Sequence, residues 1–289
     1  MKKMRREALL YLLPGLIGTL FFYVMPFIGG AYYALQSDSY PPRFVGLNNF
    51  CDLFHNNIFW NSLWNTTIFS ILCAPIAIIL ALTLACYLQK VNRSSSHIRM
   101  ALLTPYVLPT AAVVSIYKIV FGYNSYTSAF MSSIIGSNID LLQSRWQILP
   151  IIFLYVWRNV GFFTIIILSA VQVIADNLYD YADIEGASAI QKHLYVTIPI
   201  ISPSLLTVYL FAWTGALKVF KEAYALNGGY PPSNIYTLQH FINNHLSKLN
   251  YSIVTSASYV FALLLTLVFT FLFSIEKRVR DSLGGDIHE

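Results

Sequence analysis

Long apolar stretches separated by short polar segments dominate the pattern of this chain. Six of these apolar stretches run for 18 or more residues without a charged side chain, except for Arg158 inside the fourth. About 20 apolar residues cross the hydrocarbon core of a bilayer as a helix. These stretches are too long and too continuous for the alternating strands of a membrane barrel. The pattern therefore predicts an all-α integral membrane protein with six transmembrane helices. We expect these near residues 9–35, 62–88, 100–121, 148–172, 201–222 and 253–275.

The composition agrees with a membrane protein. Of the 289 residues, 56% are hydrophobic and 11% are charged, whereas about a quarter of an average soluble domain is charged. The net charge of +5 does not indicate nucleic-acid binding, because the basic residues flank the apolar stretches. The three cysteines show no CxxC spacing, so no metal site is predicted. We expect one transmembrane domain over residues 1–289.

The distribution of Lys and Arg predicts the orientation. With the amino terminus in the cytoplasm, the inside segments hold eleven of these residues and the outside segments six. Because cytoplasmic loops carry an excess of positive charge, we expect both termini in the cytoplasm.

The cytoplasmic loop 176–199 differs from the other inside segments because it is acidic. Ala182, Gly186 and Ala189 are spaced to form one stripe of small residues on a helix. Asp180 and Asp183 would lie on a neighbouring face. The pattern predicts a short helix outside the bilayer, with a smooth docking face, that ends at Pro199. An interfacial helix that merely joins two spans is the alternative.

This loop resembles the EAA loop of permease subunits in binding-protein-dependent ABC importers. Asp180 takes the acidic position, Tyr181 and Ala182 the two alanine positions, and Pro199 closes the motif. Glu185, Gly186 and Ala187 match its D-G-A. Asp180, Tyr181 and His193 depart from the usual Glu, Ala and Phe. The resemblance implies a coupling helix that sits in a cleft of an ATPase subunit, with contacts from Asp180, Ala182, Asp183, Glu185, Gly186, Ala187 and Pro199.

Other segments resemble the carbohydrate-uptake branch of these permeases. They are residues 12–15, 44–50 and 226–231. The resemblance implies a multi-pass subunit of the bacterial cytoplasmic membrane that translocates a sugar or related solute by alternating access. It also implies four kinds of partner: a second homologous permease subunit, two ATPase subunits, an extracytoplasmic solute-binding protein and the lipid bilayer.

The chain carries no ATPase motif of its own. None of its 14 glycines is followed by Lys, so GxxxxGK[ST] is absent. We therefore expect a non-catalytic subunit that binds no cofactor, with ATP and Mg²⁺ bound by the partner ATPase.

Arg158 is the exceptional residue inside an apolar stretch. It lies roughly 16 Å into the fourth predicted span at 1.5 Å per residue, where a charge is costly. It could anchor a subunit interface, line the substrate pathway together with Tyr155, Trp157 and Asn159, or lie nearer the surface than this estimate. At the end of the fifth span, Lys218 and Glu222 have the spacing of a helical ion pair.

Two other functional classes remain open from the residues alone. A transporter driven by an ion gradient would need carboxylates inside its spans, and Glu222 at a span edge is the one candidate. A membrane enzyme would need a cluster of catalytic residues near one interface, and the sequence shows none.

Overall fold

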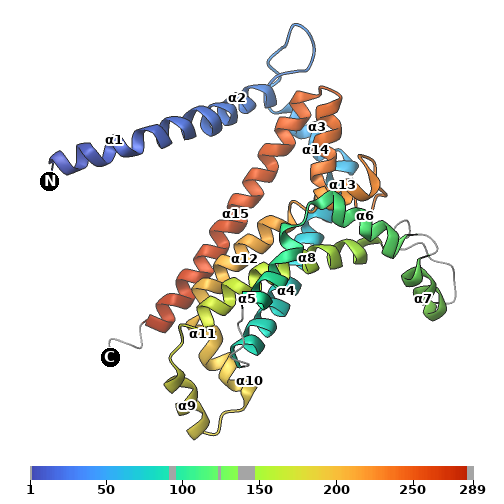
Figure 1. The fold of residues 1–289 in the computed structure, drawn as a ribbon. Helices are drawn as coiled ribbons and strands as arrows, with labels where there is room; N and C mark the ends of the chain where they lie inside the picture. Colours follow the sequence, from blue (N-terminus) through green and yellow to red (C-terminus); the bar gives the residue numbers. More distant parts are fainter. Residues whose placement is uncertain (1, 91–95, 123–124, 136–146, 285–289) are drawn as a thin grey trace. The chain divides into compact units, whose positions relative to one another are not determined.

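The computed structural model describes residues 2–90, 96–122, 125–135 and 147–284. Within these ranges the regular secondary structure is helical (Figure 1), apart from one isolated β-bridge between Gln36 and Phe44. The chain divides into two compact units. The first is Met1–Trp60 with Phe241–Thr270, and the second is Asn61–His240 with Phe271–Glu289.

Figure 1 labels the α-helices in chain order, and the described residues also form two short π-helices, η1 and η3. The elements are α1 (Lys2–Thr19), the π-helix η1 (Leu20–Val24), α2 (Met25–Ala34), α3 (Asn48–Phe54), α4 (Asn57–Lys90), α5 (Ser96–Val107), α6 (Thr110–Phe121), α7 (Tyr126–Ile135), α8 (Ile148–Val171), α9 (Asp176–Ile184), α10 (Ala189–Lys192), the π-helix η3 (His193–Thr197), α11 (Ile198–Ile200), α12 (Ser202–Ala216), α13 (Phe220–Asn227), α14 (Leu238–Ser247) and α15 (Tyr251–Gly284).

Five of the described helical stretches are long and apolar enough to cross a membrane. They coincide with the first, second, fourth, fifth and sixth predicted spans. Their bounds are Tyr11–Ala34, Asn57–Gln89, Ile148–Val171, Ser202–Asn227 and Tyr251–Ile275.

The span predicted over 100–121 is not one straight helix. His97–Val107 and Thr110–Phe121 meet at an angle of 88°. Pro109 causes the break, because proline lacks the N–H of a helical hydrogen bond and disfavours helical backbone at the preceding residue, Leu108. The residues that the structure describes therefore contain five candidate spans, or six if the bent pair counts as one.

The predicted fifth span is also interrupted. Its helix stops at Ala216, and residues 217–219 form a turn before α13 begins at Phe220. The second half extends to Asn227, which is five residues beyond the predicted end.

In the first unit, polar side chains join the loop after α2 to the start of α15. The Asp38 carboxylate accepts hydrogen bonds from the backbone N–H (3.0 Å) and the hydroxyl (2.5 Å) of Ser252. The Asn49 side-chain amide donates to the carbonyl groups of Ala34 and Gln36, each at 2.8 Å. These bonds satisfy backbone groups that the helix ends leave without partners.

In the second unit, α8 packs between α5 and α12 (Figure 1). Its contact with α5 is unusually close, because a Cβ atom added at Gly161 would lie 1.8 Å from the carbonyl oxygen of Leu102. On the other side, the Tyr155 hydroxyl donates to the carbonyl of Ala212 on α12 at 2.5 Å. Small residues at such interfaces let helix backbones approach each other in a membrane protein.

The segment between α13 and α14 is held on α4 by amide and hydroxyl groups. The Asn65 side chain donates to the carbonyl groups of Ser233 (2.6 Å) and Tyr236 (2.9 Å). The Thr66 hydroxyl accepts a hydrogen bond from the backbone N–H of Leu238 at 2.9 Å, and so caps α14.

His240, in the first turn of α14 and outside the candidate spans, predicts a loss of stability in acid. Burial among the rings of Phe220, Tyr224 and Tyr236 lowers its pKa from 6.5 to about 4. The unfolded chain therefore binds a proton at His240 between these pH values that the folded chain does not. Stability should fall as the pH drops through this window, by about 3 kcal/mol at pH 4.

The measurement is the thermal unfolding midpoint of the detergent-purified protein from pH 7.5 to pH 4. The variant His240→Gln keeps a neutral polar side chain and should flatten the profile. Parallel pH profiles of the two proteins would show that His240 does not cause the loss.

Candidate coupling segment and intramembrane polar cluster

The acidic segment 176–199 forms several short helices instead of the single helix that its periodicity predicts. Gly186 follows α9 and adopts a left-handed backbone, with φ +76°. Its N–H donates to the Asp183 carbonyl at 3.0 Å, and the Ala187 N–H donates to the Ala182 carbonyl at 2.9 Å. This is the Schellman pattern that ends a helix at a glycine. The predicted stripe of Ala182, Gly186 and Ala189 on one helix is therefore wrong.

The second helix of the segment starts with a local signal that the sequence reading did not use. Ser188 caps α10 through a capping box, in which its hydroxyl and the side chain of Gln191 each accept from the other residue's backbone N–H. Pro199 lies one residue before the end of this helical run, in α11 (Ile198–Ile200), and a turn at Ile201 separates the run from α12.

Side-chain contacts hold α9 against the helices that follow it. Lys192 of α10 forms an ion pair with Asp183 of α9. The Tyr179 hydroxyl lies 3.0 Å from that of Thr197, which is buried. Tyr179 and Thr197 were missed from the sequence, since Thr197 is 18 residues away and nothing local marks the pair. The segment is therefore one folded unit rather than a loose loop.

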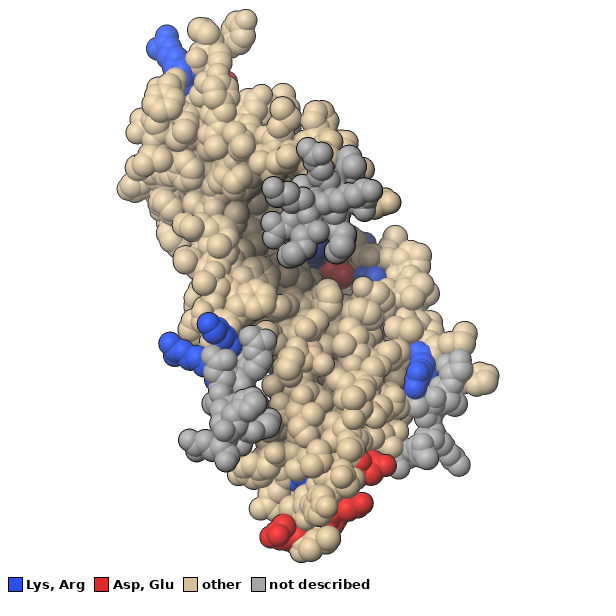
Figure 2. All heavy atoms as spheres, turned by 90° about the vertical axis from the view of Figure 1, so that its left-hand side faces the viewer, with Lys and Arg blue, Asp and Glu red and all other residues tan. Residues whose placement is uncertain are grey.

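The outer surface of this segment combines acidic and apolar side chains. Figure 2 shows acidic atoms gathered at the lower end of the molecule, at the level where Figure 1 draws α9. Asp180, Asp183 and Glu185 are exposed there. Ile184 (81% exposed) and Ile190 (71% exposed) lie in the same segment. Such a surface fits a partner that offers basic groups and an apolar pocket.

The exposed residues include most of the predicted coupling residues. Gly186 is also exposed, while Ala182, Ala187 and Pro199 are partly covered. Their predicted contact with an ATPase stays a prediction.

Two cavities separate the segment from the end of α4. One measures about 280 Å³ and is lined by Gln89, Asp176, Tyr179, Ala189, Lys192 and His193. The other measures about 300 Å³ and lies on the side of Leu82, Cys86 and Ile198, with His193 in both walls. The segment therefore does not pack tightly against α4 along its whole length.

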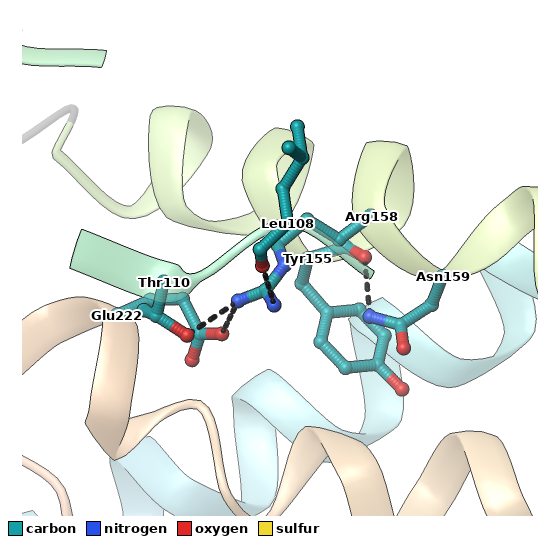
Figure 3. Close-up of polar contacts among 6 residues, drawn as sticks. All are labelled: Leu108, Thr110, Tyr155, Arg158, Asn159 and Glu222. Carbon is teal, nitrogen blue, oxygen red and sulfur yellow. Dashed lines mark hydrogen bonds and ion pairs between the residues drawn. The ribbon is translucent and has the colours of Figure 1, made fainter. Parts of the chain in front are cut away.

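The second feature is a cluster of polar groups around Arg158 (Figure 3). One guanidinium nitrogen of Arg158 donates to Glu222 (3.0 Å) and to the Thr110 hydroxyl (2.8 Å). The other donates to the Leu108 carbonyl at 3.1 Å. The side chains of Arg158 and Glu222 are only 14% and 12% exposed. A buried charge needs such a partner and additional hydrogen bonds, and Arg158 has both within this chain.

The ion pair corrects the predicted helical pair of Lys218 and Glu222. Lys218 lies in the turn between α12 and α13, so the two residues do not share one helix. Glu222 pairs instead with Arg158, which is 64 residues away in the sequence.

The other predicted pathway residues have different surroundings. Tyr155 is buried against α12, and the Asn159 side chain donates back to the Tyr155 carbonyl at 2.7 Å. Trp157 is 38% exposed. The structure thus brings Tyr155, Arg158 and Asn159 together on one side of α8 (Figure 3), while Trp157 is not part of the polar cluster. Their predicted role in a substrate pathway stays a prediction.

The described residues contain no group of three or more His, Cys, Asp or Glu that could hold a metal ion. The polar cluster is built from one cation, one carboxylate and neutral oxygen atoms. Its chemistry is suited to joining helices inside an apolar environment.

Helices of this length and apolarity are typical of an integral membrane protein. The family model described as "Binding-protein-dependent transport system inner membrane component" matches residues 74–281. The chain belongs to this family of permease subunits, which are generally non-catalytic, and it is a multi-pass protein of the cytoplasmic membrane.

Individual relatives match most of the chain. The probable ABC transporter permease protein YurN of Bacillus subtilis is 28% identical over 243 residues, which are 81% of this chain and 82% of YurN. The trehalose/maltose transport system permease protein MalF of Thermococcus litoralis is 28% identical over 285 residues, or 96% of each chain. The resemblance to ABC importer permeases is thereby confirmed, with sugar permeases among the relatives.

A solved structure shares the fold. It is a chain of a bacterial ABC transporter involved in the import of the acidic polysaccharide alginate. The TM-score is 0.78 at 24% sequence identity, with 96% of this chain and 98% of that chain covered.

Proposed function

We propose that this chain is a permease subunit of an ATP-driven ABC importer that moves a sugar or related solute into the cell by alternating access. The main support for this proposal is the family match over residues 74–281, together with the folded, acidic and exposed segment 176–199. The segment lies between α8 and α12, two of the candidate spans. Force applied to it would therefore act on two membrane helices at once.

The proposal includes the partners that such a subunit needs. They are a second homologous permease, two ATPase subunits that bind ATP and Mg²⁺, and an extracytoplasmic solute-binding protein. The chain would cross the membrane six times, with both termini and the segment 176–199 in the cytoplasm. A chain of the bacterial alginate ABC transporter has the same fold as this chain, and its solved complex includes a periplasmic protein bound to an alginate pentasaccharide.

The names of relatives support a carbohydrate as the solute. They include permeases for trehalose and maltose, sulfoquinovosyl glycerol, and lactose. These solutes share a ring or polyol with many hydroxyl groups, and some relatives are associated with acidic solutes.

Cross-linking from the coupling segment tests the proposal. The variant Ala189→Cys places a thiol on an exposed position of α10, with the exposed Cys51 changed to Ser as background. In inside-out vesicles of cells that express the whole transporter, a benzophenone–maleimide coupled to this thiol should attach to an ATPase subunit on irradiation, because the benzophenone inserts into C–H bonds of a neighbouring chain. The control Ser115→Cys, exposed on α6, should give no such product.

Uptake completes this test. Proteoliposomes with the purified complex should accumulate a labelled sugar from a panel of mono- and oligosaccharides only when ATP is enclosed with the ATPase subunits. Accumulation driven by a sodium or proton gradient without ATP would contradict the proposal and favour a secondary transporter.

A further inference from the structure

Arg158 contacts three separate elements at once. Its guanidinium group extends from α8 to Glu222 of α13, to Thr110 at the start of α6, and to the Leu108 carbonyl at the break before α6 (Figure 3). The ion pair is largely buried. A cation in this position costs free energy inside an apolar environment. Its contacts offset that cost, and they also join α8 to other elements.

Those partners belong to two broken helices. The first halves, α5 and α12, pack directly on α8. The second halves, α6 and α13, begin after the 88° bend at Leu108–Pro109 and after the turn at 217–219, and they pack on each other. The ion pair and its hydrogen bonds thus link α8 to both second halves.

The position of α8 in the chain gives this link a direction. Only residues 172–175 separate α8 from α9, and the segment 176–199 runs through α11 into α12. Tyr155 joins α8 to α12 near the same level, through its hydrogen bond to Ala212. A displacement of the segment would therefore move α8 and α12 together.

We propose that Arg158 and Glu222 are positioning residues that make the α6–α13 pair follow α8 when the segment 176–199 moves. This proposal rests on the proposed function, since it assumes that ATP hydrolysis by a partner moves that segment. The α6–α13 pair is then the part of this subunit that changes position at the far end of α8.

The test separates movement from folding. A single variant such as Arg158→Met leaves the Glu222 carboxylate buried without its partner, so it could fail to fold. The double variant Arg158→Met/Glu222→Met removes both charges, and such replacements often preserve stability. Thr110→Val is the matched control, because it removes one hydrogen bond and keeps the ion pair with α13, on which α6 packs.

The readout is the reaction of a membrane-impermeant maleimide with Lys118→Cys on α6, in the complete complex with Cys51→Ser. In the otherwise unchanged chain and in Thr110→Val, we expect the labelling rate to differ at least fivefold between the ATP-free and the vanadate-trapped complex. In the double variant we expect less than a twofold difference, although ATP hydrolysis and the yield of assembled complex are kept.

The outcomes distinguish the two proposals. A fivefold response in the double variant would overturn the role of the ion pair and leave the proposed function intact. If the unchanged complex neither takes up sugar with ATP nor changes its labelling rate, the proposed function fails and the role of the ion pair fails with it.

Discussion

Gly161→Leu should prevent this chain from accumulating as a folded membrane protein, and Gly161→Ala should destabilise it by about 3 kcal/mol or more. An added Cβ would lie 1.8 Å from the carbonyl oxygen of Leu102 and 2.6 Å from its carbonyl carbon. Both atoms belong to the backbone of α5, so no side-chain rotation relieves the contact. The whole of α5 would have to move away from α8.

The measurement is the yield of monodisperse protein on size-exclusion chromatography and its thermal unfolding midpoint in detergent. Gly29→Ala is the matched control, because its added Cβ meets no atom within 4 Å and alanine favours a helix. Gly215→Ala should fall between the two, since its Cβ would approach only side-chain atoms of Tyr155, the nearest being the hydroxyl at 3.0 Å. Equal midpoints for Gly161→Ala and Gly29→Ala would mean that α5 and α8 are farther apart than described.

Gly186→Trp should abolish the stimulation of ATP hydrolysis by the solute-loaded binding protein while the complex still assembles. Gly186 has a φ of +76°, a backbone conformation that costs other L-residues about 1–2 kcal/mol. Tryptophan adds this strain and also places a bulky ring on an exposed surface beside Asp183 and Glu185. Both effects would disturb the docking of a partner on α9.

Two further variants separate these effects. Gly186→Asn tolerates the left-handed backbone with little added bulk, so its stimulated ATP hydrolysis should stay within twofold of the unchanged chain. Gly186→Val introduces backbone strain with only moderate bulk. Its Cβ meets no atom within 4 Å, so the strain comes from the positive φ and not from a steric clash. Full stimulation of ATP hydrolysis in Gly186→Trp would show that the segment 176–199 does not couple ATP hydrolysis to transport.

The membrane spans could be predicted because the bilayer selects them by length and apolarity, which are properties of local sequence. The predicted spans 148–172 and 253–275 illustrate this, since α8 covers Ile148–Val171 of the first and α15 covers the whole of the second. Residues 100–121 satisfy the same criterion and yet bend by 88°. Hydropathy measures how apolar a segment is and does not measure whether Pro109 bends it.

The candidate site shows a similar division. The acidic character of the segment 176–199 was visible in the sequence, but its division into α9 and α10 was not, because a stripe of Ala182, Gly186 and Ala189 satisfies helical spacing equally well. The left-handed conformation of Gly186 follows the end of the first helix. The ion pair of Lys192 with Asp183 then joins the two helices.

By itself the sequence determined the class of this protein: a helical membrane subunit without an ATPase motif, with a resemblance to the importer permeases. It also marked Arg158 as a residue that needs a partner. Only the tertiary structure decided that the partner is Glu222. Helical spacing assigns neighbours correctly along an unbroken helix, and the turn at residues 217–219 separates Lys218 from Glu222. A contact across 64 residues depends on how α8 and α13 pack, which no local pattern records.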